Sequence, residues 1–348
     1  MSGLLKNAER CAYVARSFGW IASPRYWFNY FRAGESVQID RPVFLLGTQG
    51  GGLTLLSRML RREGSLISGA GGPGYWTSAD EIQNIYGCRL PLEFAGARWA
   101  YPDHPVLKGP LSWCYGADTL YPQYRRTEEH VTPPLADLLK RTIRTSLLQH
   151  RGRVANPRFI DKSQCYILRV AFIAEILKSS DPKFVLVPRD PYVSVYRAAI
   201  GNARDMKALI GKLSLKERLK VCAEHYGNCM RDALVDSDRL GLNMPVVRFE
   251  DLVETPEATV RAVCGFCELT FDQDMLPHEH HRLPFGSRFR DRWFPVRSNV
   301  NQRYEEKLDR FTIELVNQYC GDVIERLGYR RRVESESTIE EPLEQVVS

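Results

Sequence analysis

The sequence predicts an α/β protein in three layers, with a mostly parallel central sheet flanked by helices. Short apolar runs of strand length alternate with stretches that carry apolar residues at helical spacing. The clearest runs are Val43–Leu46, Phe184–Val187 and Pro245–Phe249, and a helical pattern follows each of them. Such alternation is typical of strands that pair in parallel, with helices as the connections.

A glycine-rich loop joins the first strand to its helix. Gly47 and Gly52 have the G-x4-G spacing of a phosphate-binding loop, and Leu53–Leu60 carries the helical pattern. Such a loop presents backbone N–H groups at the positive end of a helix, which is an anion site. Leu53 stands where a nucleotide triphosphatase needs its lysine, which argues against ATP or GTP hydrolysis. A glycine turn without a ligand is the alternative.

Composition favours a soluble, cytoplasmic protein. The net charge of +6 suits a small anionic ligand better than a nucleic acid. Nine cysteines without a framework spacing predict reduced thiols. We expect the single C-x-x-C pair, Cys264 and Cys267, to pack in a helix rather than bind a metal. The sequence has no run of about 18 apolar residues, so no membrane span is predicted.

Residues 1–40 form an aromatic and basic helical segment that lacks the apolar core of a signal peptide. Within it, residues 1–35 have the composition of an amphipathic surface for peripheral membrane contact. A helix packed on the flank of the protein's own domain has the same pattern and is the favoured interpretation.

Residues 41–330 are expected to form one domain, with an insertion at about 70–134 that shapes a substrate site or is an ordinary surface loop. Inside the insertion a helix is expected to begin near Ser78, with Glu81 completing a capping box. A final helix is expected from Tyr304 to Leu327. The acidic residues 331–348 are expected to be a disordered tail.

Basic residues mark two further places. Arg189 lies in a PRDP turn directly after the second strand, and open α/β sheets bind ligands at the carboxyl ends of their strands. Arginines also crowd the late segment 285–303. These positions predict additional anion contacts beside the glycine loop.

Three separated segments together resemble the sulfotransferases that use 3′-phosphoadenosine 5′-phosphosulfate (PAPS). They are FLLGTQGGGLTLLSRML at 44–60, DKSQCYILRV with FVLVPRDPYVSVYRA at 161–198, and RFEDLVETPEATVRAVCGFCEL at 248–269. The resemblance implies a P-loop fold related to the nucleotide kinases, and a reaction without a metal. A sulfuryl group carries less charge than a γ-phosphoryl group, so backbone N–H groups and one or two cations can replace magnesium.

The resemblance assigns PAPS, as co-substrate, to two places. The glycine loop would hold the 5′-phosphosulfate, and the two-pronged guanidinium of Arg189 would bind the 3′-phosphate. Arg197 stands where the family has a serine for the same phosphate; Ser194 is the alternative. Arg303 or Arg297 would cover that phosphate, although each is equally well explained as a solvated charge. The expected set is Thr48, Gln49, Gly50, Gly51, Gly52, Leu53, Thr54, Arg189, Arg197 and Arg303.

The chain departs from the family pattern at Gly50, where a lysine or arginine is usual, and at Gly51, which is usually serine. The missing cation normally contacts the leaving phosphate bridge. Either another cation compensates, or the chain binds without catalysing. Lys162, in the D-K-S stretch at 161–163, is our candidate near the sulfuryl group, and a solvated lysine at a strand end is the alternative.

The acceptor must lose a proton as it attacks, so a general base is needed. Several branches of the family keep a glutamate where Glu81 lies, although a helix cap is an equally good role for this residue. Asp80 and His104 are reserve candidates. The cluster HEHH at 278–281 lacks other obvious ligands, so surface histidines are favoured over a metal site.

The expected activity is PAPS-dependent sulfuryl transfer by in-line displacement, onto an acceptor held by the insertion. A carbohydrate is favoured because aromatic faces suit sugar rings, although they also suit a lipid or polyketide. The alternatives are a catalytically silent nucleotide-binding protein of this fold, or a small-molecule phosphotransferase. The aromatic residues concerned are Trp76, Trp99, Tyr101, Trp113, Tyr115, Tyr121 and Tyr124.

Overall fold

A computed structural model gives the fold of the chain and confirms the α/β class. It describes residues 23–69, 81–85, 90–94, 114–151, 153–278 and 296–333. Several predictions fall outside the described residues: those on Ser78, Asp80, His104, His280, His281, the start of the N-terminal segment and most of the acidic tail.

Four parallel strands form the central sheet, in the order β2-β3-β1-β4. The central strand β1 pairs with β3 through Val43 and Ile160, and with β4 through Leu46 and Leu186. Because the strands are parallel, their carboxyl ends lie at one edge of the sheet. The strands are β1 (Val43–Leu46), β2 (Leu66–Ile67), β3 (Arg158–Asp161) and β4 (Lys183–Leu186).

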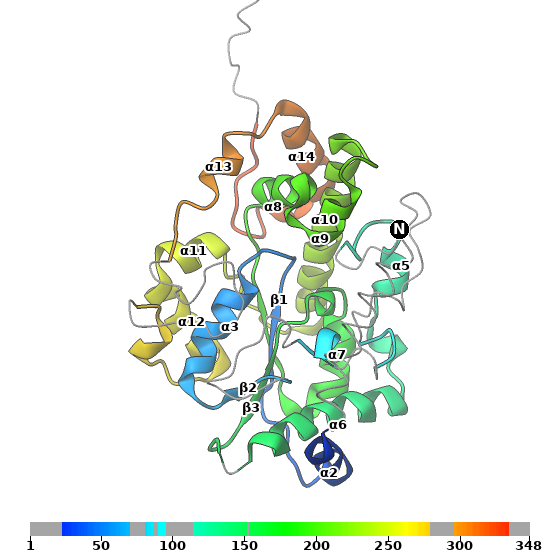
Figure 1. The fold of residues 1–348 in the computed structure, drawn as a ribbon, viewed down its shortest axis with the longest axis vertical. Helices are drawn as coiled ribbons and strands as arrows, with labels where there is room; N and C mark the ends of the chain where they lie inside the picture. The colour runs from blue at the N-terminus through cyan, green and yellow to red at the C-terminus, as the bar shows by residue number, and fades with distance from the viewer. Residues whose placement is uncertain are drawn as a thin grey trace, which may run out of the picture.

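Helices cover both faces of the sheet, as predicted (Figure 1). In this view α3 and α12 lie on one side of β1, and α6, α7 and α10 lie on the other. Alternate residues of β1 belong to two separate cores, Val43 and Leu45 to one and Phe44 and Leu46 to the other. The helices are α2 (Pro24–Arg32), α3 (Leu53–Leu60), α4 (Ile82–Ile85), α5 (Tyr121–Tyr124), α6 (Pro133–His150), α7 (Val170–Leu177), α8 (Pro191–Arg197), α9 (Arg204–Leu209), α10 (Leu215–Leu240), α11 (Phe249–Glu254), α12 (Pro256–Cys267), α13 (Gln302–Glu305) and α14 (Arg310–Ile324).

The described end of the N-terminal segment is α2, which packs against α6. Tyr26 is buried there, and Nη2 of Arg25 donates to the carbonyl oxygen of Gln149 at 2.8 Å. Phe28 and Phe31 remain exposed on the opposite face. This arrangement supports packing on the domain's flank, and membrane contact stays a prediction.

Two predicted elements differ from the structure. Pro245–Phe249 makes one isolated bridge, between Val246 and Leu186, because Pro245 has no N–H to donate and α11 begins at Phe249. The helix predicted from Tyr304 to Leu327 is two helices, α13 and α14. The second begins where the Asp309 side chain accepts a hydrogen bond from the N–H of Thr312 at 2.8 Å.

The helices α10 and α14 approach each other closely at Gly227. A Cβ at this position would lie 2.3 Å from the carbonyl oxygen of Tyr319 on α14. Alanine has a higher intrinsic helix propensity than glycine, by about 1 kcal/mol. The steric overlap is expected to outweigh this gain, so Gly227→Ala should lower the free energy of unfolding by about 1–3 kcal/mol. Denaturant unfolding measures the change.

Gly265 in α12 is the matched control for this substitution. It is exposed, and no described heavy atom lies within 4 Å of a Cβ built there, so Gly265→Ala is expected to raise the stability. A stability gain in both variants would contradict the tight helix contact.

Candidate active site

The glycine loop leaves β1 and enters α3 at Leu53, as predicted. Gly50 and Gly52 have φ angles of 86° and 97°, in the left-handed region that favours glycine. A Cβ at Gly47 would lie 2.7 Å from the carbonyl oxygen of Val187, so the loop fits closely against the end of β4. The N–H of Leu55 donates to the carbonyl oxygen of Gly52 at 2.8 Å, whereas the N–H groups of Leu53 and Thr54 come before this first helical bond and have no carbonyl partner within the helix. The loop is thus a cradle suited to a phosphate or sulfate.

The side chains of the predicted loop set differ in exposure. Thr48 and Leu53 are buried, Gln49 is half-buried and Thr54 is exposed. Leu53 belongs to the core with β1, so the position of the kinase lysine is occupied by a packed apolar side chain.

Arg189 follows β4 and reaches the loop from the neighbouring strand. Its Nη1 donates to the carbonyl oxygen of Gly50 at 3.1 Å, and its Nε and Nη2 donate to Oδ1 of Asn301 at 2.8 and 2.6 Å. The guanidinium lies over the ring of Phe249, 4.6 Å from the centroid. Burial, and next the charge of Arg197, lower the pKa of Arg189 to about 10, so the side chain stays charged at neutral pH.

Arg197 is the last residue of α8, and its guanidinium also reaches the loop. Nη1 of Arg197 lies 2.0 Å from the point that a Cβ at Gly50 would occupy. Arg189, which lies just before the cap of α8, and Arg197, which ends the same helix, therefore converge on one glycine.

The two predicted catalytic residues, Glu81 and Lys162, form a buried ion pair. Their side chains are 9% and 6% exposed. Lys162 directly follows β3, and Glu81 directly precedes α4. The structure thus brings together a carboxylate that can accept a proton and a cation that can stabilise developing negative charge.

Asp161 and Ser163 fix α4 to the end of β3. Oδ1 of Asp161 accepts from the N–H of Ile82 at 2.8 Å, and Oγ of Ser163 accepts from the N–H of Gln83 at 3.1 Å. Burial raises the pKa of Asp161 to about 6, and the charge of Glu81 is a lesser cause. Because these bonds join the two residues after Glu81 to the residues on either side of Lys162, they hold Glu81 beside Lys162.

All these groups lie at the carboxyl edge of the sheet. The glycine loop follows β1, Lys162 follows β3 and Arg189 follows β4, and these three strands are adjacent and parallel. Open α/β sheets bind ligands at this edge. The structure thus brings three segments that are far apart in the chain to one edge of the sheet, and their joint role as a site stays a prediction.

The described end of the late basic segment, residues 296–303, lies near Arg189 through the contact with Asn301. Arg303 is exposed, its Nη2 donates to the hydroxyl of Tyr304 at 2.7 Å, and its charge is one of the minor causes that lower the pKa of Arg189. Arg297 is exposed as well. Ser194 donates from Oγ to the carbonyl oxygen of Arg189 at 3.3 Å. Their roles toward the 3′-phosphate stay predictions.

Sequence reasoning missed Asn301 and Glu250. Oε1 of Glu250 accepts from Nδ2 of Asn301 at 2.6 Å and from the N–H of Asp190 at 3.1 Å, and its Oε2 accepts from the Tyr329 hydroxyl at 2.6 Å. Glu250 thus joins the PRDP turn to Asn301 and to Tyr329, which follows α14. The signal was present in the RFED stretch, where a charged residue follows a strand-like run at the same sheet edge.

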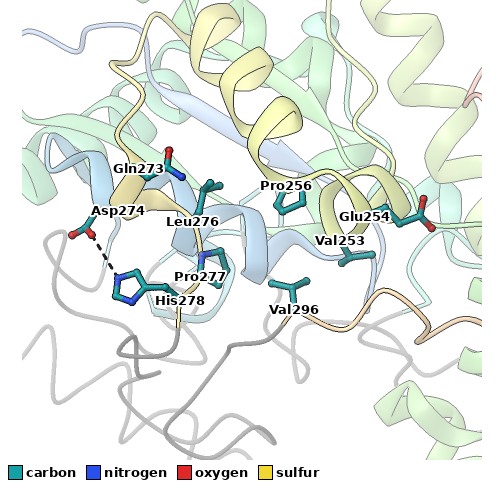
Figure 2. A pocket seen from close by; sticks show the side chains of 9 residues that line it. All are labelled: Val253, Glu254, Pro256, Gln273, Asp274, Leu276, Pro277, His278 and Val296. Carbon is teal, nitrogen blue, oxygen red and sulfur yellow. Dashed lines mark ion pairs between the residues drawn. The ribbon is translucent and has the colours of Figure 1, made fainter.

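A separate hollow of about 480 Å³ lies beside α11 and α12 (Figure 2). Its polar lining includes the carboxylates of Glu254 and Asp274, and Nε2 of His278 lies 3.6 Å from Oδ1 of Asp274. Two carboxylates repel an anionic nucleotide, so this hollow is a poor site for the donor.

Within the described ranges, no group of three or more His, Cys, Asp or Glu side chains is placed to hold a metal. None of the described helices is long and apolar enough to cross a membrane.

Comparisons with known proteins identify the family. Among solved structures, the chain is similar to the sulfotransferase domain from the curacin biosynthetic pathway, with 18% identity and a TM-score of 0.47 over 85% of this chain and 100% of that one. It is similar to the sulfotransferase domain of the Synechococcus olefin synthase, with 18% identity and a TM-score of 0.42 over 82% of this chain and 97% of that one. A sulfotransferase from Mycobacterium avium shares 12% identity, with a TM-score of 0.48 over 93% of this chain and 83% of that one.

At these identities and TM-scores the solved structures say nothing about the donor or the acceptor. No curated protein matches the chain. A model of the sulfotransferase family matches residues 42–273, which include the glycine loop, Glu81, Lys162 and Arg189. Because this match spans more than half of the sequence, the chain belongs to the sulfotransferase family.

Proposed function

We propose that this protein transfers the sulfuryl group of PAPS to a hydroxyl or amine of an acceptor, and releases adenosine 3′,5′-bisphosphate. The observation that carries the proposal is the convergence at one sheet edge of an anion-binding loop, two arginines and a buried Glu81–Lys162 pair. The first two suit an acidic nucleotide, and the third suits the transfer step.

The donor fits the charge and shape of this edge. The glycine loop offers N–H groups to the 5′-phosphosulfate, and Arg189 offers a planar fork to a phosphate. The buried Leu53 supports sulfuryl over phosphoryl transfer, because a phosphotransferase of this loop type uses a lysine there.

The transfer forms a bond from the acceptor oxygen or nitrogen to sulfur, and breaks the bond from sulfur to the bridging oxygen of the phosphosulfate. Glu81 accepts the acceptor's proton as the new bond forms. Lys162 stabilises charge on the sulfuryl oxygens, and the loop N–H groups stabilise the charge that develops on the leaving phosphate. An ion pair in the resting protein keeps both side chains in place for these roles.

A carbohydrate acceptor remains our proposal, but fewer of the predicted aromatic residues support it. Tyr115 and Tyr124 are buried and stack on each other with centroids 5.6 Å apart, and the Tyr121 hydroxyl donates to Asp232 at 2.8 Å. Tyr115 and Tyr124 are too buried to offer a ring face to a sugar, and Tyr121 is half-buried. The proposal now depends on the four aromatic residues outside the described ranges: Trp76, Trp99, Tyr101 and Trp113.

Calorimetric titration with adenosine 3′,5′-bisphosphate, followed by PAPS turnover on a panel of sugar, lipid and phenol acceptors, tests the proposal. We expect binding without magnesium and transfer to at least one acceptor. Binding without transfer to any acceptor would favour the silent nucleotide-binding protein, which the glycine at position 50 also suggests. Binding of magnesium-ATP in place of the bisphosphate would favour a phosphotransferase.

A further inference from the structure

The glycine loop contains no lysine or arginine between Gly47 and Thr54, yet a guanidinium lies directly on it. A Cβ at Gly50 would be 2.0 Å from Nη1, 2.8 Å from Cζ and 3.1 Å from Nη2 of Arg197. The guanidinium therefore fills the volume that a side chain at position 50 would need. Gly50 also has a φ of 86°, so two independent constraints require glycine there.

The backbone on both sides of Arg197 is held in place. Pro191 begins α8, and the Asp190 side chain accepts from the N–H of Val193 at 2.9 Å as the helix cap. The turn after Arg197 is fixed by Arg218, whose Nη1 donates to the carbonyl oxygen of Ala199 at 2.6 Å. The base of the Arg197 side chain is thus on a rigid element.

Arg189 and Arg197 approach Gly50 in different ways. Arg189 donates from Nη1 to the carbonyl oxygen of Gly50, while its Nε and Nη2 turn to Asn301 in the late segment. Arg197 instead covers the Cα side of Gly50. Like charges this close repel, as the effect of Arg197 on the pKa of Arg189 shows, and a bound anion relieves that repulsion.

We infer that Arg197 is the cation of the glycine loop and contacts the 5′-phosphosulfate of the donor, whereas Arg189 takes the 3′-phosphate. This assignment rests on the proposed function, and it replaces the sequence-based expectation that Arg197 binds the 3′-phosphate. Its chemical consequence is that the charge missing at position 50 is supplied in space by position 197. The negative charge that develops on the leaving phosphate then meets a guanidinium as well as N–H groups.

Titration with three nucleotides separates the two assignments. Adenosine 3′,5′-bisphosphate, adenosine 5′-phosphate and adenosine 3′-phosphate are each titrated into the wild type, Arg197→Ala and Arg197→Lys. We expect Arg197→Ala to lose roughly 10- to 100-fold in affinity for the two nucleotides with a 5′-phosphate, and less than about 3-fold for the 3′-phosphate. Arg197→Lys, which keeps the charge, is expected to recover part of this loss.

Arg261→Ala is the matched control for loss of a guanidinium, because Arg261 is exposed on α12 and pairs with Glu257. It is expected to bind all three nucleotides like the wild type. A loss in Arg197→Ala that falls on the 3′-phosphate, or on no nucleotide, overturns the inference and leaves the proposed function standing. A wild type that binds none of the three overturns the proposed function itself. Thermal unfolding of each variant shows that the affinities refer to folded protein.

Discussion

Replacing Lys162 with methionine is expected to lower kcat by roughly 10²- to 10³-fold, and replacing Glu81 with glutamine by roughly 10²- to 10⁴-fold. Both side chains are buried and paired with each other at the end of β3. The Lys162→Met variant lacks the charge that we propose stabilises the sulfuryl oxygens, and the Glu81→Gln variant lacks the carboxylate that we propose accepts the proton of the acceptor. Single-turnover transfer from PAPS measures the chemical step, and the Kd of adenosine 3′,5′-bisphosphate is expected to change little.

If the Glu81–Lys162 pair were purely structural, kcat and stability would change together. A double variant distinguishes this structural role from the catalytic role. Breaking a buried pair by removing one partner leaves an uncompensated charge and costs about 3–5 kcal/mol of stability. The double variant of Glu81→Gln with Lys162→Met removes both charges, so its stability is expected to recover. Its kcat is expected to stay low because neither chemical group is present. Recovery of kcat together with stability would contradict the catalytic assignment.

Lys183 provides the matched control for these lysine and glutamate variants. It begins β4 at the opposite edge of the sheet, where its Nζ lies 2.8 Å from Asp181 and 3.1 Å from Glu268. Lys183→Met removes a partly buried, paired lysine without touching the carboxyl edge. Its kcat is expected to stay within about 2-fold of the wild type, since it takes no part in the transfer.

The sequence predicted those parts of the fold that local signals determine. The units around β1 with α3 and β4 with α8 each combine an apolar run, a glycine or proline break and a helix start, so residues close together in the sequence suffice. The broken final helix shows the limit of this reasoning. Apolar spacing continues across Asp309, and only the cap on Thr312 reveals that a new helix begins there.

The position of a candidate site residue was predictable wherever that residue directly follows a strand. Parallel pairing brings such positions to one edge, which is why Lys162, Arg189 and the glycine loop all lie at that edge. The contacts of Asn301 and Arg197 were not predictable, because they depend on how a late segment and a helix end lie over the loop. No local pattern at Gly50 indicates that another residue's guanidinium fills its side-chain volume.

Arg189→Ala is expected to weaken binding of adenosine 3′,5′-bisphosphate by roughly 100-fold or more, as measured by calorimetry. A guanidinium gives a phosphate two charge-assisted hydrogen bonds, each worth about 1.5–3 kcal/mol. Arg189→Lys keeps the charge but loses the planar fork, so an intermediate affinity is expected. Undiminished affinity in Arg189→Ala would remove the assignment of the 3′-phosphate to this residue.

Asn301 allows a further test of the proposed contact between Arg189 and the 3′-phosphate. Its Oδ1 accepts from Nε and Nη2 of Arg189, which are the two donors that a phosphate would use. A bound 3′-phosphate must therefore displace this amide, and the displacement costs binding energy. Asn301→Ala removes the competing acceptor while the bond from Arg189 to Gly50 remains, so its affinity for the bisphosphate is expected to equal or exceed that of the wild type. A loss as large as that of Arg189→Ala would instead show that Asn301 positions the guanidinium for the ligand.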